Sequence, residues 1–401
     1  MRICILSPEF LHNWGGIGTY VQQLASNLAG DFEMHVVTLD RRAVGSRKEE
    51  RPPEGVRVHY LGEAKDNFIS NSQFQIGLLR NFNRLDAEHH FDIVHANHAQ
   101  MPDLLLRLLR RDRRVVTTVH TTIDSQRMGT VSSGLPLGSL ERSEKATFLM
   151  LPVLRRLEKE YLRRSANVIF VSEFIRGLFL RDHPAPEHSR VIYNGVDEDR
   201  FRPRPREECA SRFPQLAGRE NIVLFSGRLI ALKGLETAIK AHAMIAADEG
   251  SHLVLAGTGS IDAWRSMLER SGAPPDSYTF LGPVPYPDMP FLYPLASAFV
   301  LPSHSESCPL TLLEAMACGV PSVASAVGGV PEMARQDVDA KLFPSGDAKA
   351  LADALRSLLD DGPGSARLAK NARERVLSEF SCTLMARQTG EVYREAMEMA
   401  S

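Results

Sequence analysis

The chain has 401 residues, of which 43% are hydrophobic and 24% charged, which is typical of globular proteins. At roughly 150 residues per domain, this length predicts two domains. Lys and Arg number 47 against 49 Asp and Glu, so the net charge of −2 gives no support to a nucleic acid as partner.

The first half of the chain alternates short apolar, β-branched runs with segments of helical periodicity. The expected strands are residues 2–6, 35–39, 56–60, 93–96, 115–119 and 168–171, with helices that include 19–28 and 104–111. Strands that are apolar throughout and separated by helices are typical of a parallel sheet covered on both faces. We therefore expect a doubly wound α/β domain.

The same alternation starts again after residue 220. Expected strands are 222–226, 252–256, 278–281, 298–301 and 322–324, and expected helices are 235–247, 262–271, 310–318 and 348–359. Residues 202–206 read RPRPR, and prolines in this pattern favour extended backbone. The sequence thus predicts domains at 1–193 and 221–375, a linker at 194–220, and a C-terminal helical segment, 376–401, that is a candidate to pack back on the first domain.

Cellular location is predicted from what the sequence lacks. No apolar run reaches the about 18 residues of a membrane span, and the N-terminal residues have no apolar signal core. The five cysteines are scattered and form no Cys-x-x-Cys pair, so neither a disulfide framework nor a zinc knuckle is indicated. We expect a protein of the reducing cytoplasm.

A glycine-rich loop follows the first expected strand, where Gly15, Gly16 and Gly18 open a helix. Glycine lets backbone N–H groups approach an anion at a helix N-terminus. Two alternatives stay open: the glycines serve turn geometry alone, or they belong to a dinucleotide fingerprint. Val21 stands where that fingerprint has its third glycine, although Asp40 would suit a ribose hydroxyl.

Charged residues follow two of the strands expected in the second half. Arg228 and Lys233 lie in the loop after strand 222–226, where two cations can neutralise a diphosphate without a metal. Glu306 lies in the loop after strand 298–301, and Glu314 in the helix that we expect to begin at Pro309. Carboxylates accept hydrogen bonds from sugar or ribose hydroxyls. Solvated surface charges, or acids favoured by the helix dipole, remain the alternative.

Other candidate sites have weaker patterns. His95 and His98, and the adjacent pair His89 and His90, have no third ligand nearby in sequence, so no metal site is predicted. Residues 104–114 and 154–164 are amphipathic and basic, which suits a solvated helix face or contact with an anionic lipid or acceptor. Residues 197–199 read Asp-Glu-Asp, which we interpret as a solvated turn.

Together the motifs resemble the retaining glycosyltransferases of family GT4, which have the two-domain GT-B fold. The motifs that carry the resemblance follow the family's order along the chain. They are Gly15-Gly16, His120, residues 171–173 (VSE), 194–197 (NGVD), the GR-x4-KG run at 227–234, the pair Glu306-x7-Glu314, and residues 315–321 (AMACGVP) and 327–332 (VGGVPE).

The resemblance implies two Rossmann-like domains that face a central cleft, and it implies roles for individual residues. The catalytic residues would be His120, Arg228, Lys233 and Glu306. Arg228, Lys233 and the Gly16 amide would bind the diphosphate, Glu314 the ribose, and Glu306 a hydroxyl of the transferred sugar. The implied donor-binding set is Gly16, Arg228, Lys233, Gly282, Val284, Glu306, Ser307, Leu310, Thr311 and Glu314.

The implied reaction transfers a sugar from a nucleoside diphosphate sugar to an acceptor hydroxyl with retention of configuration. A UDP-sugar is favoured and GDP-mannose stays open; no metal and no cofactor are expected. The acceptor would be a small molecule, a glycan or a lipid, and a lipid would bring peripheral contact with the inner membrane face. The alternatives are a nucleotide-sugar epimerase of the same architecture, an NAD-dependent oxidoreductase, and a glycosidase that uses two carboxylates.

One position departs from the family's pattern. Cys308 and Pro309 stand where many relatives carry Phe-Gly, and a proline has no N–H to donate. We therefore expect this loop to offer one backbone donor fewer, with the start of the helix intact.

Overall fold

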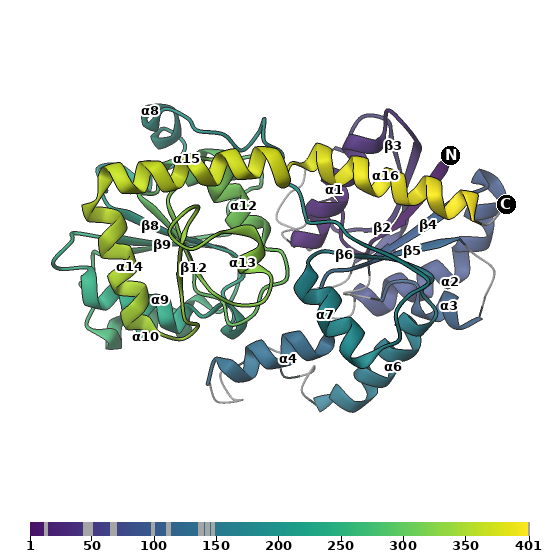
Figure 1. The fold of residues 1–401 in the computed structure, drawn as a ribbon, viewed down its shortest axis with the longest axis horizontal. Coiled ribbons are helices and arrows are strands. Elements are labelled where there is room, and N and C mark those ends of the chain that lie inside the picture. The colour runs from purple at the N-terminus through teal and green to yellow at the C-terminus, as the bar shows by residue number, and fades with distance from the viewer. Residues whose placement is uncertain are drawn as a thin grey trace. The chain divides into compact units, whose positions relative to one another are not determined.

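Figure 1 shows the computed structural model of the chain, which describes residues 1–11, 15–42, 51–64, 70–97, 101–109, 114–134, 140, 145 and 149–399. The chain divides into two compact units. Unit 1 is Met1–Ile123, Met150–Gly195 and Cys382–Ser401, and unit 2 is Asp124–Leu149 and Val196–Ser381. Each unit is built on one parallel sheet, so the prediction of two doubly wound, Rossmann-like domains is confirmed.

Unit 1 has a seven-stranded sheet in the order β3-β2-β1-β4-β5-β6-β7. Its strands are β1 (Arg2–Leu6), β2 (Glu33–Asp40), β3 (Val56–Glu63), β4 (Ile93–Asn97), β5 (Val115–Val119), β6 (Asn167–Phe170) and β7 (His188–Val191). Its helices are α1 (Gly16–Leu28), α2 (Ser70–His89), α3 (Leu104–Leu109), α6 (Leu151–Arg163), α7 (Glu173–Asp182) and α16 (Cys382–Glu398). The strand order reverses between β1 and β4, which is where such sheets bind ligands.

Unit 2 has a six-stranded sheet in the order β10-β9-β8-β11-β12-β13, and its order reverses between β8 and β11. The strands are β8 (Ile222–Ser226), β9 (His252–Ala256), β10 (Tyr278–Gly282), β11 (Ala298–Leu301), β12 (Ser322–Ser325) and β13 (Lys341–Phe343). The helices are α4 (Ile123–Ser132, whose first residue lies in unit 1), α8 (Arg206–Ala210), α9 (Leu235–Ile245), α10 (Ile261–Ser271), α11 (Met289–Leu292), α12 (Leu310–Ala317), α13 (Val330–Met333), α14 (Ala348–Asp360) and α15 (Gly362–Glu379), with 3₁₀ turns at Pro214–Leu216, Ala231–Lys233 and Tyr293–Leu295.

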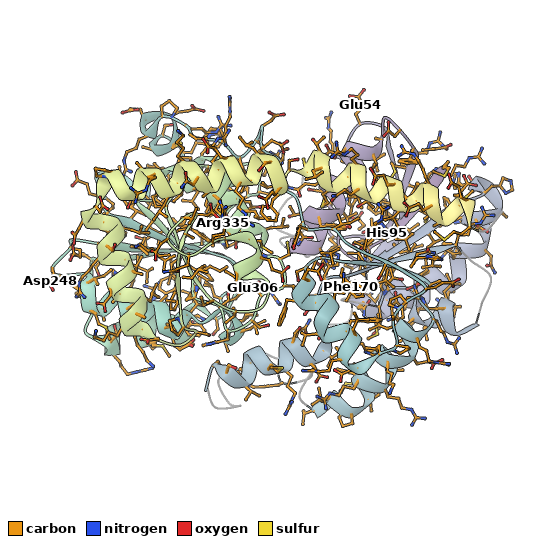
Figure 2. All side chains as sticks on the ribbon, viewed as in Figure 1. Glu54, His95, Phe170, Asp248, Glu306 and Arg335 are labelled. Atoms are coloured by element: carbon orange, nitrogen blue, oxygen red, sulfur yellow. The ribbon has the colours of Figure 1, made fainter. Side chains whose placement is uncertain are left out.

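The C-terminal helix α16 packs on unit 1, beside α1 (Figure 1). Tyr393 brings its hydroxyl to 2.6 Å from His95 Nδ1, and His95 Nε2 lies 2.7 Å from the Thr118 hydroxyl. Burial lowers the pKa of His95, which Figure 2 labels, to about 3, so the ring is neutral. His95 is therefore a satisfied core histidine that joins α16 to the sheet; His98 lies outside the described residues.

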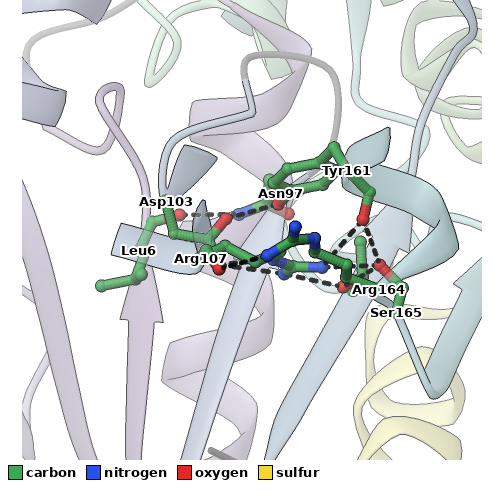
Figure 3. A network of polar contacts seen from close by, with 8 residues as sticks. Leu6, Asn97, Asp103, Arg107, Tyr161, Arg164 and Ser165 are labelled. Atoms are coloured by element: carbon green, nitrogen blue, oxygen red, sulfur yellow. Dashed lines mark hydrogen bonds and ion pairs between the residues drawn. The ribbon is translucent and has the colours of Figure 1, made fainter. Parts of the chain in front are cut away.

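The expectation that the basic residues of 104–114 face solvent or an anionic partner is wrong at Arg107, which is buried and belongs to the network of polar contacts in Figure 3. Its guanidinium donates to Asp103 Oδ2 at 2.9 Å and to the Ser165 hydroxyl at 2.6 Å, and it lies over the ring of Tyr161. Tyr161 also donates to Asp103 Oδ1 at 2.5 Å. The arginine thus ties α3 to α6 inside unit 1 instead of facing solvent; residues 110–113 lie outside the described part.

Candidate functional site

The loops that follow β8, β9, β10 and β11 meet at one edge of the unit 2 sheet, because all these strands run parallel. The loop after β8 carries Arg228 and Lys233, and the loop after β11 carries Glu306 (Figure 2). β8 and β11 are the two strands at which the order reverses. Residues that sequence analysis assigned to a diphosphate and a sugar therefore flank the position where α/β sheets bind ligands.

Lys233 and Glu306 form an ion pair. Lys233 Nζ lies 2.6 Å from Glu306 Oε1, and the hydroxyl of Ser303 donates to the same oxygen at 2.7 Å. The lysine side chain is 22% exposed and that of the glutamate 9%. Both contacts fall on Oε1, which leaves Oε2 able to accept from a ligand hydroxyl.

A glycine brings these two loops together. Gly234 has φ 64°, in the left-handed region, and a Cβ there would lie 2.0 Å from the carbonyl oxygen of Pro302. The amide of His304 also donates to the carbonyl of Leu232 at 2.9 Å. Any larger residue at 234 would push the loop with Lys233 away from the loop with Glu306.

Arg228 is exposed, and within the described part of the chain its guanidinium has no hydrogen-bond or ion-pair partner. Its neighbours are fixed: the amide of Leu229 donates to Thr258 at 2.7 Å, and a Cβ on Gly257 would lie 1.7 Å from the Gly227 carbonyl oxygen. A fixed loop thus presents a cation with unused donors, which is what an anionic ligand requires.

Glu314 is buried on α12 and accepts a hydrogen bond from the hydroxyl of Tyr293 at 2.6 Å. Burial raises its pKa to about 7, although Tyr293, the charge of Arg200 and Tyr286 each lower it. Burial, with the charge of Glu314, also raises the pKa of Tyr293 well above its usual value. This carboxyl changes charge near neutral pH, so it does not act as a solvated helix-end acid.

The helix α12 begins at Leu310, the first residue of the expected range 310–318, whereas Pro309, a good first helical residue by sequence, lies just before it. Pro309 is the N-cap residue, with φ −71° and ψ 112°, and Leu310 is the first helical residue. No side chain caps this end, so the amides of the first turn remain available as donors toward the loop. Of the remaining donor candidates, Gly282 and Val284 are buried around the end of β10, whereas Ser307 and Thr311 are half-buried.

Three polar residues beside this loop were missed by the sequence analysis. His304 Nε2 forms a short contact with Glu236 Oε1, and His304 Nδ1 lies 2.9 Å from the hydroxyl of Ser345. Glu236 Oε2 is buried without a hydrogen-bond partner among the described residues. His304 is 41 positions from Ser345 and 68 positions from Glu236 in the chain, and no motif spacing indicates that these residues meet.

In unit 1, His120 follows β5, and Asn97 and Tyr20 are two of its neighbours. Its Nε2 lies 2.9 Å from Asn97 Oδ1, and its ring packs edge-on against Tyr20 with centroids 4.7 Å apart. Gly16 is exposed as the first residue of α1, and Gly15 is its N-cap without a side-chain cap. His120 and Asn97 thus lie at the carboxyl ends of β5 and β4, beside the reversal of strand order.

The alternative dinucleotide site finds little support at its acidic residue. Asp40 ends β2, but both of its oxygens accept from the guanidinium of Arg42, at 3.1 and 2.9 Å from Nε. Val21, in the place of the third glycine, is a core residue of unit 1.

The Asp-Glu-Asp run at residues 197–199 forms a turn in which Asp197 Oδ1 accepts from the amide of Arg200 at 3.0 Å.

Two family models match the chain: one described as Glycosyltransferase Family 4 over residues 14–200, and one described as Glycosyl transferases group 1 over residues 208–375. D-inositol 3-phosphate glycosyltransferase of Mycobacterium avium is 31% identical in an alignment 382 positions long that covers 89% of this chain and 84% of that protein. Glycogen synthase of Mycobacterium tuberculosis is 29% identical in an alignment 420 positions long that covers 99% of this chain and 95% of that protein.

Solved structures share the fold. Sucrose-phosphate synthase from Thermosynechococcus elongatus aligns with a TM-score of 0.80 and 24% identity, covering 99% of each chain. HepE from Anabaena, in complex with UDP-glucose, aligns with a TM-score of 0.77 and 20% identity, covering 98% of this chain and 100% of that one. Among the described residues, no helix combines the length and apolarity that crossing a membrane requires.

Proposed function

Because the chain belongs to the family 4 glycosyltransferases of GT-B type, we propose that it moves a sugar from a nucleoside diphosphate sugar to an acceptor hydroxyl, with retention of anomeric configuration. The observation that carries this proposal is the ion pair of Lys233 and Glu306, on the loops after β8 and β11, together with Arg228 on the β8 loop, whose guanidinium has no partner among the described residues. Two cations and a carboxylate with a free oxygen meet the needs of a diphosphate and a sugar hydroxyl.

Donor binding is assigned to unit 2. Lys233 and Arg228 bind the diphosphate, and the carboxylate of Glu306 accepts from a hydroxyl of the sugar. Glu314 accepts from the ribose hydroxyls. The amides of Ser307, Leu310 and Thr311 bind phosphate or sugar oxygens, and the segment with Gly282 and Val284 lies near the base. This division gives unit 2 the donor and unit 1 the acceptor.

The leaving group is a nucleoside diphosphate, so negative charge grows on its β-phosphate as the bond to the sugar breaks. Lys233 and Arg228 stabilise that charge, and the Gly16 amide and the first turn of α12 add hydrogen-bond donors. The acceptor oxygen bonds to the anomeric carbon on the face that the phosphate leaves, and its proton passes to a β-phosphate oxygen. His120 contacts the sugar near the reacting carbon. This route needs no carboxylate nucleophile.

The donor favoured here is a UDP-sugar, with GDP-mannose as the second choice, and the acceptor is a small molecule, a glycan or a lipid. We place the reaction in the cytoplasm, with peripheral contact to the inner membrane face if the acceptor is a lipid. The names of the two curated relatives suggest an α-glucan and inositol 3-phosphate as first acceptors to try.

The test incubates the protein with UDP-glucose, UDP-N-acetylglucosamine or GDP-mannose, with and without each acceptor, and measures free nucleoside diphosphate. We expect release that depends on the acceptor, and a product whose anomeric configuration, read by NMR, equals that of the donor. Isomerised nucleotide sugar without release would instead support an epimerase. An inverted product would overturn the retaining mechanism while leaving the transferase assignment in place.

A further inference from the structure

Three histidines from three elements of unit 1 gather at one end of its sheet. His35 lies on β2, His59 on the edge strand β3, and His89 is the last residue of α2. One ring nitrogen from each lies within 4.8 Å of the others. Sequence analysis found no third ligand near His89 in the chain, and the two further imidazoles of this cluster come from distant strands.

The sheet register holds two of these rings on one face. His35 pairs with Arg57 and Val37 with His59, so His35 and His59 are diagonal neighbours on adjacent parallel strands. His35 Nδ1 lies 2.8 Å from His59 Nε2, and the His89 ring centroid is 4.8 Å from each of the other two. The backbone therefore fixes the approach of the three rings.

A carboxylate orients the most buried of the rings. The side chain of His35 is fully buried, and its Nε2 lies 3.3 Å from Glu33 Oε1 while its Nδ1 faces the cluster. A metal-ligating histidine typically donates its second ring N–H to a carboxylate in this way, which fixes the tautomer and the ring plane. Glu33 also binds Arg2 and Arg57, so its position is set from outside the cluster.

We propose that His35, His59 and His89 bind a divalent transition metal ion of the zinc type, with water at the fourth position. Imidazole nitrogens are preferred ligands of Zn²⁺, Ni²⁺ and Cu²⁺. A tetrahedral ion about 2.0 Å from each nitrogen sets the nitrogens about 3.3 Å apart. The observed nitrogens lie within 4.8 Å of one another, so binding requires the side chains to adjust toward this spacing.

The ion would stabilise unit 1 by cross-linking three of its elements. It joins the edge strand β3 to β2 and to the end of α2, and His35 and His59 are 24 positions apart. Because the unfolded chain does not hold the three imidazoles together, binding favours the folded state. None of the three residues belongs to the proposed donor site, so this inference is independent of the proposed function.

The test titrates chelator-treated full-length protein with Zn²⁺ alone by calorimetry, and with Co²⁺ to follow the visible absorption of a tetrahedral complex. We expect one ion per chain and a metal-dependent rise in Tm. His59→Gln and His89→Gln should each lower the Zn²⁺ affinity at least about tenfold and abolish the rise in Tm. The matched control is His188→Gln, an exposed histidine on β7 of the same unit, which should bind as the parent does.

A positioning role for Glu33 gives a test that leaves all three imidazoles in place. Glu33→Gln should lower the Zn²⁺ affinity by about 10- to 100-fold, as outer carboxylates of metal sites do. Tm without metal shows whether each variant is folded before it is titrated. The proposal is overturned if the parent takes up no Zn²⁺, or if the His59 and His89 variants, folded by that criterion, bind Zn²⁺ as the parent does.

Discussion

The two units share a sheet plan but place different chemistry at the reversal of strand order. In unit 2 the loops there carry charge: Lys233 paired with Glu306, and Arg228 exposed. In the corresponding region of unit 1, among the described residues, His120 is hydrogen-bonded to the neutral side-chain amide of Asn97. The comparison shows that the sheet topology sets where a ligand site lies, and that the loop residues set the chemistry of that site. In the proposed function, stabilisation of a departing diphosphate is therefore assigned to the charged unit.

The largest effect on turnover should come from removing the cation of Lys233 in unit 2. Lys233→Ala is expected to lower kcat by about 100- to 1000-fold, because one donor to the developing phosphate charge is lost and the Glu306 carboxylate is left without its partner. The matched control is Lys240→Ala, an exposed lysine on α9 of the same unit. Steady-state release of nucleoside diphosphate gives kcat, and near-normal turnover of the Lys233 variant would remove the basis for the comparison.

The close approach of the two charged loops should be visible in stability. Gly234→Ala is expected to lower the free energy of unfolding by roughly 2–4 kcal/mol, because its Cβ would overlap the carbonyl of Pro302 and φ is positive. Gly250→Ala, at φ 57° with open space around it, isolates the backbone cost of about 1–2 kcal/mol. Urea unfolding measures both, and equal losses would show that the contact at Pro302 contributes nothing.

The neutral side of the comparison predicts a smaller loss. His120→Ala is expected to lower kcat by about tenfold, the value of one hydrogen bond between neutral groups, with the affinity for UDP unchanged. The measurements are kcat with the donor sugar and calorimetric titration with UDP. A loss as large as that of the Lys233 variant would mean that His120 carries charge in the transition state, and the contrast between the units would fail.

The fold was predictable where strands are mostly buried. β1, β5, β8, β9 and β11 have the expected bounds, because apolar runs in a covered parallel sheet leave little ambiguity. β7 was missed because its sequence, HSRV, is polar and half exposed at the sheet edge. The 20-residue helix α2 was missed as well, since only five of its residues are buried and its apolar pattern is sparse.

The site was predictable to the level of which residues follow which strand, and no further. Strand order places Lys233 and Glu306 at one sheet edge once both loops are known. That they form an ion pair, and that Tyr293 donates to Glu314 from 21 positions away, depends on tertiary packing. The same holds for the histidine cluster of unit 1, whose members come from two strands and a helix.

The smallest effect, a pH dependence, belongs to Glu314. Burial raises its pKa to about 7, and in the proposed site the ionised carboxylate accepts from the ribose hydroxyls more strongly than the protonated acid does. Donor affinity should therefore fall as the pH drops below about 7, approaching about tenfold per pH unit for one coupled proton. The terminal phosphate of UDP titrates in the same range, at about pH 6. Glu314→Gln keeps the effect of the phosphate on the pH dependence of affinity and removes the effect of the carboxyl.

The sign for stability follows from the same pKa. Between its ordinary pKa of 4.5 and the raised pKa of about 7, the folded chain keeps a proton on Glu314 that the unfolded chain has lost, so stability falls as the pH rises through this window. In Glu314→Gln this fall of stability with pH should be absent. The part of the pH dependence of UDP affinity that comes from Glu314 should be absent as well. Urea unfolding and UDP calorimetry at pH 5.5, 6.5 and 7.5 measure the stability and the UDP affinity of both proteins. If parent and variant show the same pH dependence, Glu314 ionises at an ordinary pKa and is not the charged acceptor for the ribose.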